Sequence, residues 1–241
     1  MPDTLSLDKV MRIRRHQPTR LEGFVDASFA FAVTLVVISL GHAPSTVDEM
    51  LRALHGIPTF AICFLLLVRI WLAHRDWSRH YDLDDATTVV LSLALVLIIL
   101  IYVYPLRILF AQMFLGFSGG RLSDGMIQPI QTVDELRAAY TVFGLGLAAV
   151  SAVFLLLYRH SLRKAAEIEL SQAELIFTRM KMSSWYEQIT FCAISIAAAH
   201  LLPMSNYWSY SLPGMIYALS AISGPITRRY YRRKIELLAT T

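Results

Sequence analysis

Residues 20–40 read RLEGFVDASFAFAVTLVVISL, and this stretch decides the fold. Two acidic residues, Glu22 and Asp26, stand near its start, and no charged residue follows up to position 40. The hydrocarbon core of a bilayer is about 30 Å thick and needs about 20 apolar residues in a helix. The stretch therefore predicts a membrane-spanning helix.

The rest of the chain agrees with a membrane protein. Of its 241 residues, 56% are hydrophobic and only 17% are charged, a balance that water-soluble domains rarely show. The same 20-residue template finds six apolar runs in all, at about 21–40, 54–74, 86–106, 138–158, 189–202 and 207–226. We therefore expect an all-α polytopic protein with six transmembrane helices, which together form a single membrane domain over residues 1–241.

Basic residues alternate between the two sides of these runs. Seventeen Lys and Arg lie on the side that holds both chain ends, and three lie on the other side. Cytoplasmic loops carry the excess of Lys and Arg in membrane proteins, so both termini are predicted to be cytoplasmic. Thr46 and Thr132 precede the second and fourth runs, each with Glu three residues later, which is the spacing of a helix-capping box.

The segments between the runs are interpreted from their composition. Residues 161–184 mix charged and apolar residues at helical spacing, which predicts a cytoplasmic helical linker. Residues 227–241 form a basic cytoplasmic tail that can meet anionic membrane lipid. Residues 113–132 contain four glycines and a proline, which favours one long external loop.

The sequence signals of several functional classes do not occur in this chain. Cys63 and Cys192 lie in apolar runs, so neither a disulfide framework nor a metal site is expected, and no cofactor is predicted. The basic residues are dispersed between the runs, which argues against a nucleic-acid partner. No nucleotide loop, zinc-ligand pair or hydrolase elbow occurs, so we do not expect an enzyme. An intramembrane enzyme would need His74 to meet Asp84 or Asp85 in space.

The first run carries the most informative chemistry. An ionisable residue such as Asp26 inside a membrane helix is costly and is a functional candidate by default. The alternative is a carboxylate near the membrane surface that accepts hydrogen bonds from the free amides at the helix start.

The start of this run also has a recognisable pattern. Arg20, Phe24 and Asp26, followed by a small and apolar stretch that ends in TLVV, resemble the first-helix signature of the transmembrane protein 175 family of endolysosomal potassium channels and their bacterial homologues. The usual signature has serine before the aspartate, where this chain has Val25. Trp71 and His74 resemble the Trp-x-x-His at the end of the family's second helix, and residues 104–105 read Tyr-Pro late in the third run.

The resemblance implies a homotetrameric channel permeable to potassium and other monovalent cations. Its pore would be lined by the first helix of each subunit, without a carbonyl selectivity filter. The positions that narrow the pore in the family correspond here to Phe31, Leu35 and Ile38, and a family threonine corresponds to Thr34. A polar network that holds the pore helix would comprise Arg20, Phe24, Asp26, Trp71 and His74.

Helical geometry gives the three narrowing residues a mechanism. Phe31, Leu35 and Ile38 follow i, i+4, i+7 and fall on one stripe, so a ring of helices can present three apolar collars to its axis. A narrow apolar bore excludes water and gates by dewetting. Packing against lipid or other helices is the alternative use of such a stripe. The hydroxyls of Thr34 and Ser39 can face a passing ion or bond to carbonyls of their own helix.

One further functional class stays open. A secondary transporter would show broken helices in corresponding positions of its two halves. In this chain the sixth run contains Pro213 and Gly214. In either case, the expected location is the cell membrane, as a multi-pass protein of the bacterial inner membrane.

Overall fold

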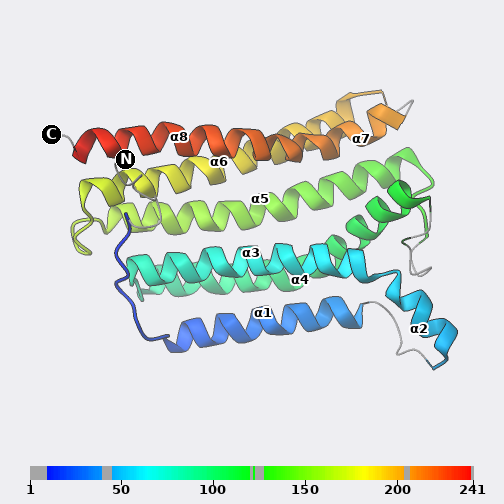
Figure 1. Ribbon diagram of the computed structural model, residues 1–241, viewed down its shortest axis with the longest axis horizontal. Helices are drawn as coiled ribbons and strands as arrows, with labels where there is room; N and C mark the ends of the chain where they lie inside the picture. Colours follow the sequence, from blue (N-terminus) through cyan, green and yellow to red (C-terminus); the bar gives the residue numbers. More distant parts are fainter. Residues whose placement is uncertain (1–9, 40–44, 120–121, 123–127, 204–206, 240–241) are drawn as a thin grey trace, which may run out of the picture.

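The computed structural model describes residues 10–39, 45–119, 122, 128–203 and 207–239, and these residues form helices without a strand. The long helices are α1 (Arg20–Ile38), α3 (Ile57–Tyr81), α4 (Ala86–Ser118), α5 (Val133–Arg163), α6 (Gln172–Leu201) and α8 (Ser220–Ala239). Shorter elements are α2 (Val47–Leu54), α7 (Tyr207–Met215) and the 3-10 helix η2 (Ile216–Leu219). Figure 1 shows the long helices side by side, with the described segment before α1 and the C-terminal end of α8 at the same end of the bundle.

Local capping sets where several helices begin. Thr19 caps α1 through a complete capping box with Glu22, in which each side chain accepts a hydrogen bond from the other residue's backbone N–H. Thr132 caps α5, as its spacing predicts. Thr46 caps the short helix α2 instead of a spanning helix. The spanning helix α3 begins later, at Ile57, with a proline in its first turn.

Four helices are long and apolar enough to cross a membrane: α1, α3, α4 up to Gly116, and α5. They overlap the first four predicted runs, although Leu54 belongs to α2 and Leu40 lies outside the described residues. The fifth run covers the second half of α6 and ends at its C-cap, Leu202, while the first half of α6 carries Arg179 and Lys181. The sixth run is divided among α7, η2 and α8.

The connecting segments differ in extent from their sequence interpretation. Helix α4 continues through residue 113 to Ser118 and ends at Gly119, whose φ of +60° is a left-handed conformation that suits glycine. Residues 161–184 are divided between the end of α5, turns over residues 164–169 and the first turns of α6. The basic tail continues α8 as far as Ala239, and residues 240–241 lie outside the described part of the chain.

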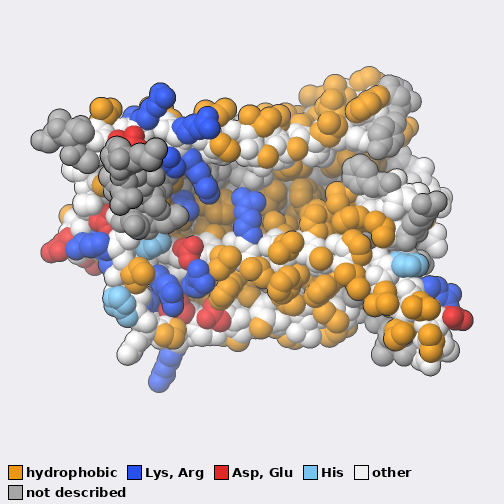
Figure 2. Space-filling view, viewed as in Figure 1, with side chains coloured by type: hydrophobic (Ala, Val, Ile, Leu, Met, Phe, Trp, Pro, Cys, Tyr) orange, Lys and Arg blue, Asp and Glu red, His pale blue; other side chains and the backbone are white. Residues whose placement is uncertain are grey.

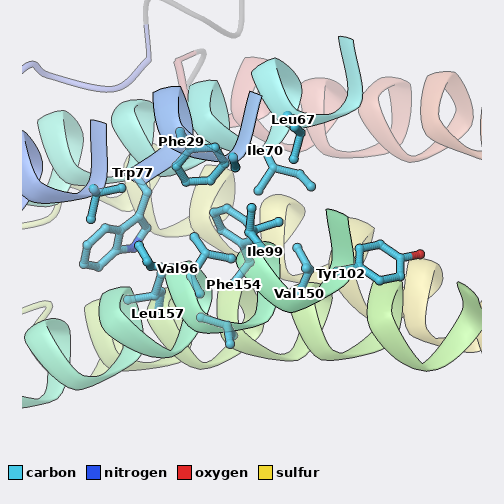
Figure 3. Packing of buried hydrophobic residues seen from close by; sticks show 14 of the residues in the cluster. Phe29, Leu67, Ile70, Trp77, Val96, Ile99, Tyr102, Val150, Phe154 and Leu157 are labelled. Carbon is cyan, nitrogen blue, oxygen red and sulfur yellow. The ribbon is translucent and has the colours of Figure 1, made fainter. Parts of the chain in front are cut away.

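The core lies between α1, α3, α4 and α5. Figure 3 shows Phe29 of α1 and Trp77 of α3 within one apolar cluster with side chains from α4 and α5. Trp77 is 1% exposed, and its indole N–H donates to the hydroxyl of Ser161 at 3.0 Å. Phe154 is fully buried and stacks on Trp185 of α6, which joins α6 to the same core.

Charged side chains are unevenly distributed along the bundle. Figure 2 shows most of the visible Lys, Arg, Asp and Glu side chains at the end of the bundle where α8 ends, while apolar side chains cover a broad band beyond it. A bilayer would accommodate this band, and the charged end would stand in water.

Candidate functional site

Helix α1 has two different faces. Val25, Ala32 and Val36 are fully buried, Phe29 is nearly so, and these residues pack into the core with α3 and α4. Their spacing of three and four residues places them on one side of the helix. The opposite side carries no packing of this kind and includes large apolar side chains. An apolar face left open in a single chain must be covered by lipid or by another protein surface.

The predicted narrowing residues lie on or beside this open face. Phe31 is 54% exposed and Ile38 is 61% exposed. Leu35 is partly buried and packs against the core cluster, so it lies at the edge of the open face. At about 100° per residue, the three side chains lie within about 60° of one another around the helix.

The two candidate hydroxyls bond to their own helix. Thr34 is exposed, and its hydroxyl donates to the carbonyl of Ala30 at 3.1 Å. Ser39 donates to the carbonyl of Val36 at 2.7 Å. A hydroxyl that donates its proton in this way still presents oxygen lone pairs outward, so this bonding does not remove its capacity to face a cation.

Asp26 joins α1 to α3 near the charged end of the bundle. The indole N–H of Trp71 donates to a carboxylate oxygen of Asp26 at 2.7 Å. Both residues line a groove of about 260 Å³ between the helices, whose other walls are mostly apolar. The guanidinium of Arg75 stands over the Trp71 ring at 5.3 Å. The hydrogen bond therefore fixes the position of α1 relative to α3 at one point.

Replacing Trp71 with phenylalanine is expected to lower the free energy of unfolding by about 1 kcal/mol, since it removes the donor and keeps most of the ring. Asp26→Asn is the matched control, because the amide oxygen still accepts from the indole N–H, and we expect it to cost less. Unfolding in mixed micelles, followed by circular dichroism, measures both. An equal loss in the two variants would contradict this role for the hydrogen bond.

The other signature residues have separate surroundings. His74 is 3% exposed, and its Nε2 lies 3.0 Å from the hydroxyl of Ser92 on α4. Phe24 is 53% exposed. Arg20 is exposed and makes no side-chain hydrogen bond or ion pair with the residues that the structure describes. Val25 is fully buried in the core, an environment that suits valine better than the serine of the usual signature.

The residues of the alternative enzyme site do not come together in the described structure. His74 bonds to Ser92, whereas Asp85 caps α4 by accepting from the amide of Thr88 and also lies 2.7 Å from His160 of α5. The pKa of Asp85 is below its usual value because these hydrogen bonds outweigh the effect of desolvation. The pair of Asp85 and His160 connects the start of α4 to the last turn of α5.

Sequence reasoning missed a polar cluster in front of α1. The guanidinium of Arg14 forms two hydrogen bonds with the Glu174 carboxylate, at 2.9 and 3.0 Å. It also donates to the carbonyls of His80, Ile168 and Glu169. We call this cluster the Arg14–Glu174 clasp. Its partners are far apart in the sequence and belong to α3, the α5–α6 turn and α6, so no local sequence motif predicts the clasp.

The clasp lowers the pKa of the Glu174 carboxyl group. Glu174 is 1% exposed, and burial alone would raise its pKa, but hydrogen bonds from Arg14 and from the amides of Ser171 and Arg12 lower the pKa to about 2. A carboxylate whose folded pKa is depressed stabilises the fold above its unfolded pKa, near 4.5. That contribution is lost as the pH falls from about 4.5 towards 2.

We expect the wild type to lose up to about 3 kcal/mol of stability across this pH window through Glu174. Glu174→Gln has no such titration and should show a correspondingly flatter profile between pH 4.5 and 2. Thermal unfolding in detergent at stepped pH provides the measurement. Equally steep profiles for the two proteins would show that Glu174 does not carry this linkage.

The chain is similar to known potassium channels. The family model described as "Endosomal/lysosomal potassium channel TMEM175" matches residues 20–105, which contain α1, α3 and the Asp26–Trp71 contact. A protein of Marivirga tractuosa named "Potassium channel" is 28% identical over 242 residues, which cover 96% of each chain. Potassium channels conduct ions and are not enzymes.

A solved structure is also similar. It is the crystal structure of a threonine-to-alanine variant of the potassium channel MtTMEM175 in complex with a nanobody–MBP fusion protein. The superposition has a TM-score of 0.78 at 27% sequence identity, and it covers 91% of this chain and 97% of that one. The likeness therefore includes the second half of the chain, beyond the range of the family model.

Proposed function

Since the chain belongs to the TMEM175 family, we propose that it is a potassium-permeable cation channel, a homotetramer whose pore is lined by α1 of each subunit. The supporting observation is the open apolar face of α1, opposite the face that packs on α3 and α4. A single chain contributes one α1 helix, which cannot surround a pore by itself. Four copies arranged about an axis would cover it.

The proposed gate is a hydrophobic constriction. Phe31 and Ile38 would face the axis most directly, and Leu35 would narrow the bore from the side, because it also packs on its own subunit. Water leaves a narrow apolar bore, and a hydrated cation cannot pass until the bore widens. In the open state, the exposed oxygen of Thr34 and the faces of four Phe31 rings would be available to a dehydrating cation.

The proposed membrane arrangement has six spans, with both termini in the cytoplasm. Helix α6 and the α7–α8 segment would supply the last two spans beside the four that are apolar enough by themselves. The segment before α1, the C-terminal end of α8 and most visible charged side chains lie at one end of the bundle, which supports this orientation. The location would be the bacterial inner membrane, with anionic lipid next to the basic end of α8.

Two measurements on purified protein test this proposal. Native mass spectrometry in detergent should give four chains of 27.2 kDa each. Proteoliposomes should then release potassium down its gradient without a counter-ion requirement. A monomeric mass would contradict the pore arrangement, and the absence of flux from tetrameric protein would contradict the channel activity.

A secondary transporter is the second candidate, and one observation favours it. Prolines interrupt both the third long helix and the last spanning segment, at Pro105 within α4 and Pro213 within α7. Figure 1 shows α4 turning away from its initial direction towards its C-terminal end. Broken helices in corresponding positions of two halves are typical of transporters. Uptake that saturates and depends on a counter-ion would favour this function over a channel.

A further inference from the structure

The segment in front of α1 contacts parts of the molecule that α1 itself does not pack against, namely α6 and the α5–α6 turn, as well as the C-terminal end of α3. Helix α1 packs on α3 and α4. The preceding residues run across the end of the bundle, where the amides of Arg14 and Arg15 donate to the carbonyl of Arg79, in the last turn of α3, at 2.9 and 3.1 Å. Figure 1 shows this segment passing from the side of α5 and α6 to the start of α1.

The Arg14 guanidinium is saturated with hydrogen bonds in the clasp. All three nitrogens of Arg14 donate hydrogen bonds, to the Glu174 carboxylate and to three backbone carbonyls from the end of α3 and the α5–α6 turn. The Arg14 side chain is 12% exposed and that of Glu174 is 1% exposed. The planar fork of arginine suits such bidentate pairing, and a buried charge is stable only when paired in this way.

Further contacts hold the same segment. The amide of Arg12 donates to Glu174 at 3.1 Å, and the guanidinium of Arg15 donates to Asp82 at 2.6 Å. Met11 is 5% exposed and belongs to the core cluster. After Arg15, only three residues, 16–18, separate this anchored segment from Thr19, the N-cap of α1. Such a short connection transmits any movement of the segment to the first turn of α1.

Because α1 is the proposed pore helix, we infer that Arg14 and Glu174 are positioning residues for gating: the clasp restrains the cytoplasmic end of α1 and holds the constriction narrow at rest. This inference rests on the proposed function. A helix behaves as a rigid rod over its 19 residues, so a displacement at its first turn also tilts the stripe that contains Phe31 and Ile38. Release of the clasp should therefore favour the wider state of the pore.

The decisive variant is Glu174→Gln, compared with Glu169→Gln as a matched control. Glu169 is exposed on the adjacent turn and contributes only its backbone carbonyl to the clasp, so its variant removes the same charge and leaves the contacts in place. We expect Glu174→Gln to raise potassium flux about fivefold or more, at the lower end of typical coupling between linked sites. The ratio of potassium to sodium flux and the tetrameric mass should stay at wild-type values, because the constriction itself is unchanged.

A second variant keeps the clasp intact and therefore does not depend on the folding of Glu174→Gln. Insertion of Gly-Ser-Gly after Gln17 lengthens the exposed connection and leaves every clasp contact available. It should raise flux in the same direction as Glu174→Gln. Flux that falls or stays within about twofold of wild type in the insertion variant, or an equal rise in Glu169→Gln, would overturn the inference.

Hydrogen exchange separates this inference from the proposed function. The amides of residues 22–25 should exchange faster in Glu174→Gln than in Glu169→Gln, even if reconstituted wild type conducts no potassium. If the wild type conducts potassium, and Glu174→Gln changes neither the hydrogen exchange nor the flux, the positioning role is overturned. The channel proposal then still stands. If the wild type conducts no potassium, the result counts against the channel proposal. Unaltered hydrogen exchange in Glu174→Gln would then still contradict a restraint of α1 by the clasp.

Discussion

Replacing Phe31 with serine is expected to raise potassium flux about tenfold or more. The side chain is 54% exposed on the open face of α1, so in the proposed tetramer four phenyl rings would be replaced by four hydroxyls. A wider and wettable bore lowers the cost of passing a hydrated cation. A tenfold change in flux corresponds to only about 1.4 kcal/mol in the free-energy barrier to permeation, which is small compared with the free energy of dehydrating an ion. The measurement is potassium release from proteoliposomes that contain equal amounts of wild-type or variant protein.

Two companion variants make this result specific. Leu35→Ser should also raise flux, although less, because Leu35 packs partly on its own subunit. Val37→Ser is the matched control: Val37 is 47% exposed on the same helix but lies about 120° around it from Phe31. Unchanged flux in both Phe31→Ser and Leu35→Ser would refute the assignment of the constriction.

Replacing Gly146 with alanine is expected to destabilise the fold by about 1–3 kcal/mol, the usual cost of overpacking. A Cβ at this position would lie 2.1 and 2.2 Å from two ring carbons of Tyr102 on α4. That ring cannot move aside easily, because Tyr102 is 4% exposed and its hydroxyl donates to the carbonyl of Phe143 at 2.8 Å. The α4–α5 contact should therefore open, and thermal unfolding in detergent should show a lower midpoint.

Gly116→Ala is the control for helix propensity. A Cβ at Gly116 would meet nothing within 4 Å, and alanine is favoured over glycine inside a helix by up to about 1 kcal/mol. This variant should be as stable as wild type or more so. If Gly146→Ala unfolded at the same temperature as Gly116→Ala, the close approach of Tyr102 to α5 would be contradicted.

The sequence was most informative where local chemistry decides the structure. Uninterrupted apolar runs predict the helices that span residues 57–81 and 133–163, because a long apolar segment in a membrane must satisfy its own backbone hydrogen bonds. Thr132 marks the start of α5 for a similar reason, since a side-chain oxygen there satisfies a free amide. The lengths were underestimated because helices continue past the apolar run into the charged region.

Contacts between distant segments could not be read from the sequence. The small-residue spacing of Gly144 and Ala148 is visible in the sequence, but the closest approach occurs at Gly146, whose partner Tyr102 lies on another helix. Arg14 and Glu174 are 160 positions apart and have no motif in common. Similarly, periodicity places Leu35 on the stripe with Phe31, and only the packing of α1 shows that it lies at the edge of the open face.

The most direct test of the pore assignment is potassium flux through an Ile38→Cys variant before and after treatment with a charged methanethiosulfonate reagent. Ile38 is 61% exposed on α1, whereas the native Cys63 and Cys192 are buried. The account predicts that modification blocks flux in this variant and leaves the wild type unaffected. Flux that persists unchanged after mass spectrometry has confirmed modification at position 38 would contradict a pore lined by α1.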